Sequence, residues 1–97
     1  MSELPSEERP LGIEGLLGIG LDGRPDDLHI TRGENFYLYG GSKPTHEHMR
    51  ETVLRLNDKV DARGKKLNEI NARELGEIAG ELRKEMPGPR RTRRRAP

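Results

Sequence analysis

The sequence predicts a small α+β domain, in which a three-stranded antiparallel sheet, or a β-hairpin alone, is covered by two antiparallel helices. Two observations predict this class. Before residue 40, apolar and polar residues alternate over short runs, whereas after it apolar residues recur every three or four positions. In addition, only 30% of the 97 residues are hydrophobic. The core is therefore expected to be small, and the sequence shows no internal repeat and no second domain.

Three short strands are expected. The first, residues 16–21, is rich in glycine and is followed by a turn at residues 22–27, where Gly, Pro and Asp favour a chain reversal. The runs at residues 28–32 and 36–39 then form a hairpin through a tight connection at residues 33–34. If the strands pair in chain order as a meander, one face of the sheet is apolar and needs a cover. The residues expected on that face are Leu17, Ile19, Leu21, Leu28, Ile30, Phe36 and Leu38.

The first helix is expected to begin at Ser42 or Thr45, either of which can cap it, and to run to about Arg63. Pro44 is tolerated because amides in the first turn have no acceptor within the helix. Gly64 closes the helix. Its apolar stripe, which suits packing on the sheet, is Met49, Val53, Leu56 and Val60, widened by Leu54.

The second helix is expected to begin at a capping box formed by Asn71 and Glu74 and to end at Pro87. Gly76 and Gly80 lie four residues apart on it. Since each costs about 1 kcal/mol relative to Ala, we expect them to permit a close approach to another backbone. The apolar stripe of this helix is Leu75, Ile78, Ala79 and Leu82.

The two ends of the chain differ in charge. Residues 1–10 hold three Glu and one Arg, whereas residues 87–97 hold five Arg and no acidic residue. Neither end has enough apolar surface to offset the entropy of ordering it. We therefore expect a disordered acidic segment at residues 1–10, one domain at residues 11–86 and a disordered Arg-rich tail at residues 87–97.

Few residues suggest chemistry. His46 and His48 lie two apart on the expected helix and so point about 200° apart, which argues against a shared metal. A helix that begins only at Thr45, with a loose first turn, would relax this objection and let His29 approach from the sheet. We expect His46 at the rim of the apolar stripe and His48 in solvent. Small residues at positions 40–42 precede the helix, where exposed amides favour an anion and Lys43 would add charge. They lack the spacing of a phosphate-binding loop, so a turn and a cap are favoured.

The sequence therefore predicts no enzyme and no catalytic, cofactor-binding or metal-binding residue. An anion- or metal-dependent enzyme at the helix start, around Gly41 and His46, is the least favoured alternative. The absence of Cys removes disulfides and thiolate chemistry. The longest apolar-leaning run, residues 11–21, is too short and too polar to cross a bilayer, and the acidic first residues are unlike a secretory signal. We expect a cytoplasmic protein with no membrane partner.

Protein binding is the function that the sequence favours. Tyr37 and Tyr39 alternate with Phe36 and Leu38, so they are expected on an exposed face. Tyrosines are enriched at interfaces, although a role as ordinary cross-strand partners is equally favoured. Small domains also reinforce a thin core by association. We expect a small interaction protein that binds a protein partner or itself, for example as a homodimer, through the folded domain.

Nucleic-acid binding is the alternative function, and the Arg-rich tail favours it. Its guanidinium groups can neutralise phosphates, with little discrimination between sequences. An acidic protein surface as the tail's partner, or a solubilising role, is favoured about equally. The residues expected to contact nucleic acid are Arg90, Arg91, Arg93, Arg94 and Arg95, extended by Lys65 and Lys66.

Overall fold

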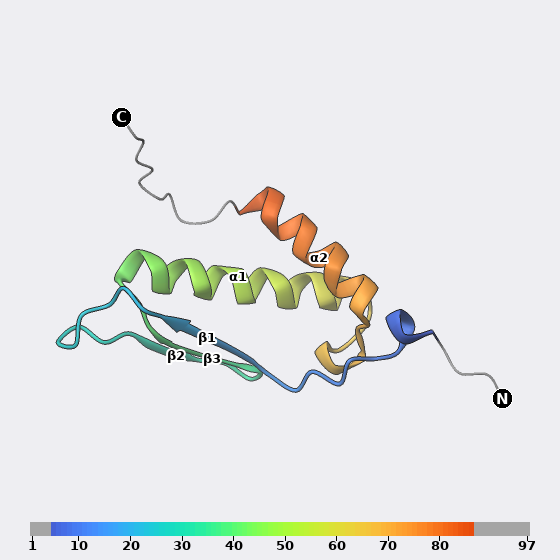
Figure 1. The fold of residues 1–97 in the computed structure, drawn as a ribbon, viewed down its shortest axis with the longest axis horizontal. Helices are drawn as coiled ribbons and strands as arrows, with labels where there is room; N and C mark the ends of the chain where they lie inside the picture. The colour runs from blue at the N-terminus through green and yellow to red at the C-terminus, as the bar shows by residue number, and fades with distance from the viewer. Residues whose placement is uncertain (1–4, 87–97) are drawn as a thin grey trace.

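The computed structural model describes residues 5–86 of the chain and confirms the α+β class. Two helices and a three-stranded sheet form the body of the fold (Figure 1). The main elements, in chain order, are β1 (Leu16–Gly20), β2 (Ile30–Arg32), β3 (Phe36–Gly40), α1 (Lys43–Ala62) and α2 (Ala72–Glu85). Two short 3-10 turns, η1 (Ser6–Glu8) and η2 (Leu67–Glu69), precede β1 and α2. The predicted tail at residues 87–97 lies outside the described residues.

The sheet is mixed, with the strand order β1-β3-β2, so the predicted antiparallel meander is wrong. The hairpin of β2 and β3 is antiparallel as expected, and Gly33 donates its backbone N–H to the carbonyl of Phe36 at 2.9 Å. β1 instead pairs in parallel with the other edge of β3. Residues 21–29, expected to contain a tight reversal, form a longer connection that carries the chain past β3 to the position of β2. The turn-forming residues therefore predict that a connection lies here, but they do not predict how long it is.

The predicted apolar face is also wrong, because the register turns β1 the other way and places Ile30 of β2 on the same face as Tyr39. Leu17 pairs with Tyr37 and Ile19 with Tyr39, so these leucine and isoleucine side chains share a face with the tyrosines. Gly18 lies on the inner face beside α1. A Cβ added to Gly18 would lie 2.8 Å from Leu38 Cδ2 and 3.2 Å from Met49 Sδ. The glycine side of β1 thus gives α1 room to lie close to the sheet.

Helix α1 lies along the inner face of the sheet (Figure 1). It is capped by Ser42, whose Oγ accepts the Thr45 N–H at 3.4 Å, and Gly64 follows its last turn with φ of 70°. Both boundaries agree with the sequence prediction. Leu54 is 41% exposed and does not widen the buried stripe, whereas His46, expected at the rim, is only 6% exposed.

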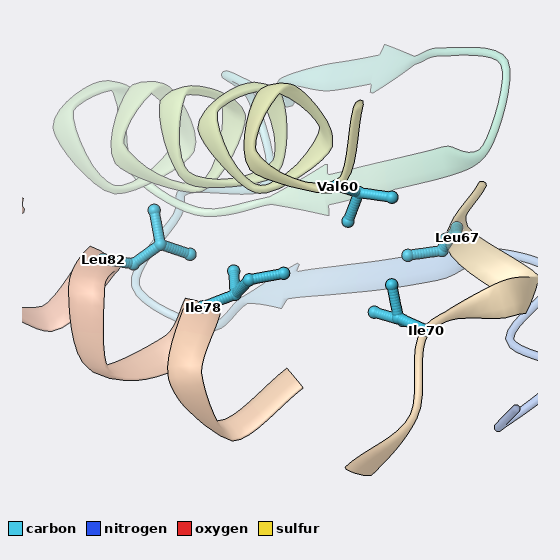
Figure 2. Close-up of a cluster of buried hydrophobic side chains, with 5 residues drawn as sticks. All are labelled: Val60, Leu67, Ile70, Ile78 and Leu82. Atoms are coloured by element: carbon cyan, nitrogen blue, oxygen red, sulfur yellow. The ribbon is translucent and has the colours of Figure 1, made fainter. Parts of the chain in front are cut away.

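Helix α2 packs on α1 and η1, so only α1 lies along the sheet, in place of the two helices expected there. The Asn71–Glu74 capping box is confirmed, with both reciprocal hydrogen bonds present. Lys59 pairs with Glu81 while Arg63, further along α1, pairs with Glu77, so the helices are antiparallel. The main core lies between the C-terminal half of α1, η2 and α2 (Figure 2). Its buried residues are Val60, Leu67, Ile70, Ile78 and Leu82.

The expected close approach at the glycines of α2 is wrong. A Cβ added to Gly76 or to Gly80 would meet nothing within 4 Å. Ala79, expected in the apolar stripe, is exposed, while Ile78 and Leu82 are buried. The buried stripe of α2 is therefore narrower than the sequence suggests, because the helix meets α1 along one line and does not also lie on the sheet.

Candidate interaction surfaces of the sheet

No helix or strand of residues 5–86 lies over the outer face of the sheet (Figure 1), and the large apolar side chains on this face are exposed. The strand register arranges them in two rows, one of Leu17, Tyr37 and Arg32 and the next of Ile19, Tyr39 and Ile30. Both tyrosines are exposed, as the alternation with Phe36 and Leu38 predicts.

This face continues beyond the strands. Leu21 and Leu28 line a hollow of about 290 Å³ together with Tyr39, at the end of β1 and β3. The exposed fractions of the large apolar residues on this face run from 37% at Tyr37 to 91% at Leu21. These seven residues are Leu17, Ile19, Leu21, Leu28, Ile30, Tyr37 and Tyr39. At roughly 180 Å² for a fully exposed large residue, they present about 700 Å² together. Patches of more than a few hundred Å² on a small protein mark binding surfaces.

The second surface is the free edge of β1. Leu16 donates its N–H to the carbonyl of Asn35 on the β3 side at 2.9 Å. Because successive residues of a parallel ladder alternate between the two edges, Leu16, Gly18 and Gly20 turn their backbone groups toward β3. Leu17 and Ile19 therefore turn theirs outward. Within residues 5–86, no strand or bridge pairs with this edge. It has neither a charge nor a proline to protect it.

An apolar groove of about 340 Å³ runs beside that edge, between β1 and α1. Since three residues of β1 line it and only Leu38 comes from β3, it lies on the β1 side of α1. His48, expected in solvent, is half-buried in its wall. The lining residues are Leu16, Leu17, Gly18, Leu38, His48, Met49, Thr52, Val53 and Leu56. This groove is not predicted from the sequence, although the glycine at the centre of β1 is a signal for it.

The anion position considered at the start of α1 is filled by a carboxylate of the chain itself. Asp22 accepts the backbone N–H of Ser42 at 2.7 Å, the Ser42 hydroxyl at 3.0 Å and the Thr45 hydroxyl at 2.8 Å. These hydrogen bonds lower the pKa of Asp22, and the bond from the Ser42 backbone amide has the largest effect. Lys43 lies 3.9 Å from Glu47, on the helix. An external anion would have to displace Asp22 from these donors.

The histidines are also placed apart from a common ligand. The Nδ1 of His46 lies 2.9 Å from the Gly40 carbonyl and its Nε2 lies 2.7 Å from the Thr31 hydroxyl. A carbonyl only accepts, so Nδ1 carries a proton, and in the neutral ring Nε2 accepts from Thr31. His29 does approach from the sheet, with the two ring centroids 5.6 Å apart, but His48 faces the groove. In the part of the chain that is described, no three His, Asp or Glu side chains form a metal-binding group.

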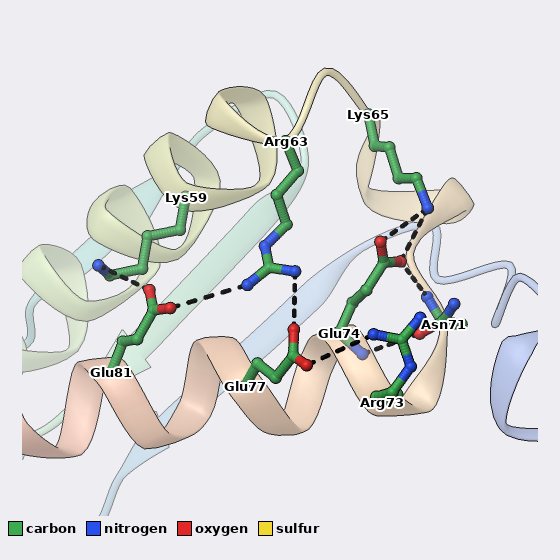
Figure 3. Close-up of polar contacts among 8 residues, drawn as sticks. All are labelled: Lys59, Arg63, Lys65, Asn71, Arg73, Glu74, Glu77 and Glu81. Carbon is green, nitrogen blue, oxygen red and sulfur yellow. Dashed lines mark hydrogen bonds and ion pairs between the residues drawn. The ribbon is translucent and has the colours of Figure 1, made fainter.

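One of the two lysines expected to contact nucleic acid is held inside the domain. Lys65 Nζ lies 2.9 and 2.8 Å from the two carboxylate oxygens of Glu74 (Figure 3). This hydrogen bond, followed by that from the Asn71 amide, lowers the pKa of Glu74. Lys66 is exposed. The five arginines expected to bind phosphates, Arg90, Arg91, Arg93, Arg94 and Arg95, lie outside the described residues.

A separate group of ion pairs joins the two helices. Lys59 contacts Glu85 at 2.8 Å and Glu81 at 3.1 Å, and these hydrogen bonds, that of Glu85 first, raise the pKa of Lys59. Arg63 bridges Glu77 and Glu81 in the next turn (Figure 3). The basic side chains of α1 that face α2 are thus paired within the domain. They are not free to bind a partner, so the uncovered apolar face of the sheet is the candidate binding surface.

Among residues 5–86, the structure contains no helix with the length and apolar character needed to span a bilayer. In comparisons with known proteins, no family model, no curated protein and no solved structure matches this chain.

Proposed function

We propose that this chain is a small cytoplasmic, non-enzymatic interaction protein that binds a protein partner, or itself, through the outer face of its sheet. The observation that carries the proposal is the uncovered apolar face of about 700 Å². A standard interface buries about 800 Å² on each partner, so this face has the size that a specific contact needs.

The residues of the face suit that role. Tyr37 and Tyr39 lie on the central strand, so a partner would bury them most completely. Tyrosine combines a large apolar ring with a hydroxyl that can bond at the rim of an interface. Arg32 shares a row with Tyr37 on the edge strand β2, where it adds a polar boundary. The non-enzymatic part of the proposal is supported by His46 and Asp22, whose polar atoms are engaged in hydrogen bonds within the fold.

Site-specific photocrosslinking tests the proposal. A photoreactive phenylalanine analogue is placed at Tyr39 and, as a matched control, at Leu54, which is similarly exposed but lies on α1. In cells of the source organism, the Tyr39 position should capture a discrete polypeptide, identified by mass spectrometry as this chain or another. The additional substitution Tyr37→Ser should abolish the capture. Equal capture from both positions, or none from Tyr39, would refute the proposed face.

Nucleic-acid binding is a second candidate function, favoured by the five arginines among the last eleven residues of the sequence. Fluorescence anisotropy with duplex DNA and single-stranded RNA would compare the full chain with one that ends at Met86. If all five arginines contact phosphates, log K should fall with log salt with a slope of about −4.5 for duplex DNA. Equal binding by both chains would remove the tail from consideration.

A further inference from the structure

We infer that two copies of this chain associate edge to edge, with their β1 strands antiparallel about Gly18, into one six-stranded sheet. This inference rests on the proposed function in assigning the chain to protein binding. It names a second copy as a partner, and it places that partner on the edge of the sheet, away from the tyrosines.

The backbone of β1 is already arranged for this pairing. Leu17 and Ile19 turn their N–H and C=O groups to the open edge. In an antiparallel pair centred on Gly18, Leu17 lies opposite the partner's Ile19, and Ile19 opposite the partner's Leu17. Each of these opposed pairs exchanges two hydrogen bonds, so four backbone bonds form. They satisfy the groups that the edge exposes to water in a single copy.

The two-fold axis of such a pair passes midway between the two Gly18 residues, perpendicular to the sheet, so both copies of α1 lie on the same side. Helix α1 packs against β1 and β3, which places it about one strand spacing, roughly 5 Å, from the axis. The two helices then lie about 10 Å apart, which is the distance at which helices pack. Their facing side chains would be those that line the groove, including Met49, Val53 and Leu56.

The side-chain pattern of β1 favours a second copy over an unrelated strand. A strand added at this edge must carry small residues on its inner side, because α1 lies close above it, and large apolar residues on its outer side. On its inner side β1 has Gly18, Gly20 and Leu16, and in this register each Leu16 lies opposite a glycine of the other copy, while Leu17 and Ile19 lie outside. Gly18 would meet its own counterpart at the axis, so no side chain separates the helices.

The charges near the edge also permit two copies to meet. β1 carries no charged residue, so the paired strands themselves bring no like charges together. Glu14 and Asp22, which flank the strand, fall opposite one another in this register, and the Asp22 carboxylate is held by hydrogen bonds at the start of α1. On α1, Glu51 lies next to groove residue Thr52, and its carboxylate is paired with Arg55 at 3.0 Å. An isologous contact places identical surfaces together, and here these are the uncharged edge of β1 and a groove lined mostly by apolar side chains.

The substitution Ile19→Pro tests the pairing directly. It removes an outward N–H that β3 does not use, and an edge strand tolerates proline at such a position. The matched control, Ile19→Thr, keeps that N–H while reducing apolar surface on the outer face. The oligomeric state of the full chain is measured by sedimentation velocity over a wide range of concentration, and far-UV circular dichroism checks the fold. Should Ile19→Pro fail to fold, Val53→Asp in the groove replaces it.

Wild-type protein and Ile19→Thr should sediment as dimers. Ile19→Pro should raise the dissociation constant about 10- to 100-fold, since two of the four hydrogen bonds are lost. A monomeric wild type at every concentration, or a folded Ile19→Pro variant that dimerises as tightly as wild type, would overturn the inference. The double variant Tyr37→Ser and Tyr39→Ser separates the two proposals: it should remain a dimer even though it loses contacts made by the outer face. If it becomes monomeric while Ile19→Pro stays dimeric, self-association belongs to the outer face.

Discussion

Replacing Gly76 and Gly80 of α2 by alanine should stabilise the protein by about 2 kcal/mol in total. Glycine costs about 1 kcal/mol relative to alanine inside a helix, because it loses more backbone entropy on folding. Neither replacement meets a steric obstacle, since a Cβ at either position has nothing within 4 Å. Each kcal/mol should raise the melting temperature by roughly 4–8 °C for a domain of this size.

Two other glycines provide controls for the same substitution. Gly18→Ala should destabilise by about 1–3 kcal/mol, because its Cβ would lie 2.8 Å from Leu38 Cδ2. Gly64→Ala meets no atom, but its φ of 70° should cost about 1–2 kcal/mol. Urea unfolding followed by circular dichroism measures all four variants, with an unchanged m-value as the condition for comparison. Destabilisation by Gly76→Ala or Gly80→Ala would refute the reasoning and show that α2 packs against a further backbone at that position.

Three further predictions concern buried polar groups, ionised carboxylates and the core. Thr31→Val should destabilise by about 1–3 kcal/mol in urea, because His46 Nε2 loses its buried donor; unchanged stability would contradict that bond. The pKa values of Asp22 and Glu74 lie below their ordinary 3.8 and 4.5, so their stabilisation is complete above those values and is lost as pH falls through the lowered ones. Denaturation from pH 6 to 2 should therefore show a flatter profile for Asp22→Asn combined with Glu74→Gln, and a profile parallel to wild type would count against these contacts. Ile78→Ala should cost about 2–5 kcal/mol, and a cost typical of a surface position would be inconsistent with its burial.

The features that the sequence predicts correctly depend on neighbouring residues. The Asn71–Glu74 capping box, the Ser42 cap and the end of α1 at Gly64 are each specified within a few positions, so local chemistry decides them. The exposure of Tyr37 follows in the same way, because alternation along one strand separates it from Leu38.

The features that the sequence does not predict depend on distant segments. Alternation divides β1 into two faces, but both faces suit a core, one with Leu17 and Ile19 and the other with Leu16 and glycines. The inner face is decided by Met49, which approaches Gly18 from a helix that begins more than twenty residues later. The groove beside β1 depends on the same approach. No count of apolar residues within the strand contains that information.

The contact of Asp22 with the start of α1 has a consequence for the order of folding. Asp22 is separated by 20 residues from Ser42, whose backbone N–H donates a hydrogen bond to the Asp22 carboxylate. A carboxylate so distant along the chain reaches the helix only after β1 and the connection beyond it have docked. The other end of α1 does not depend on β1 in this way, since Val60 packs against Ile78 in the cluster formed by the two helices. We expect α1 to nucleate toward its C-terminal end. The amides of its first turn should become protected from hydrogen exchange last, once β1 has joined the sheet.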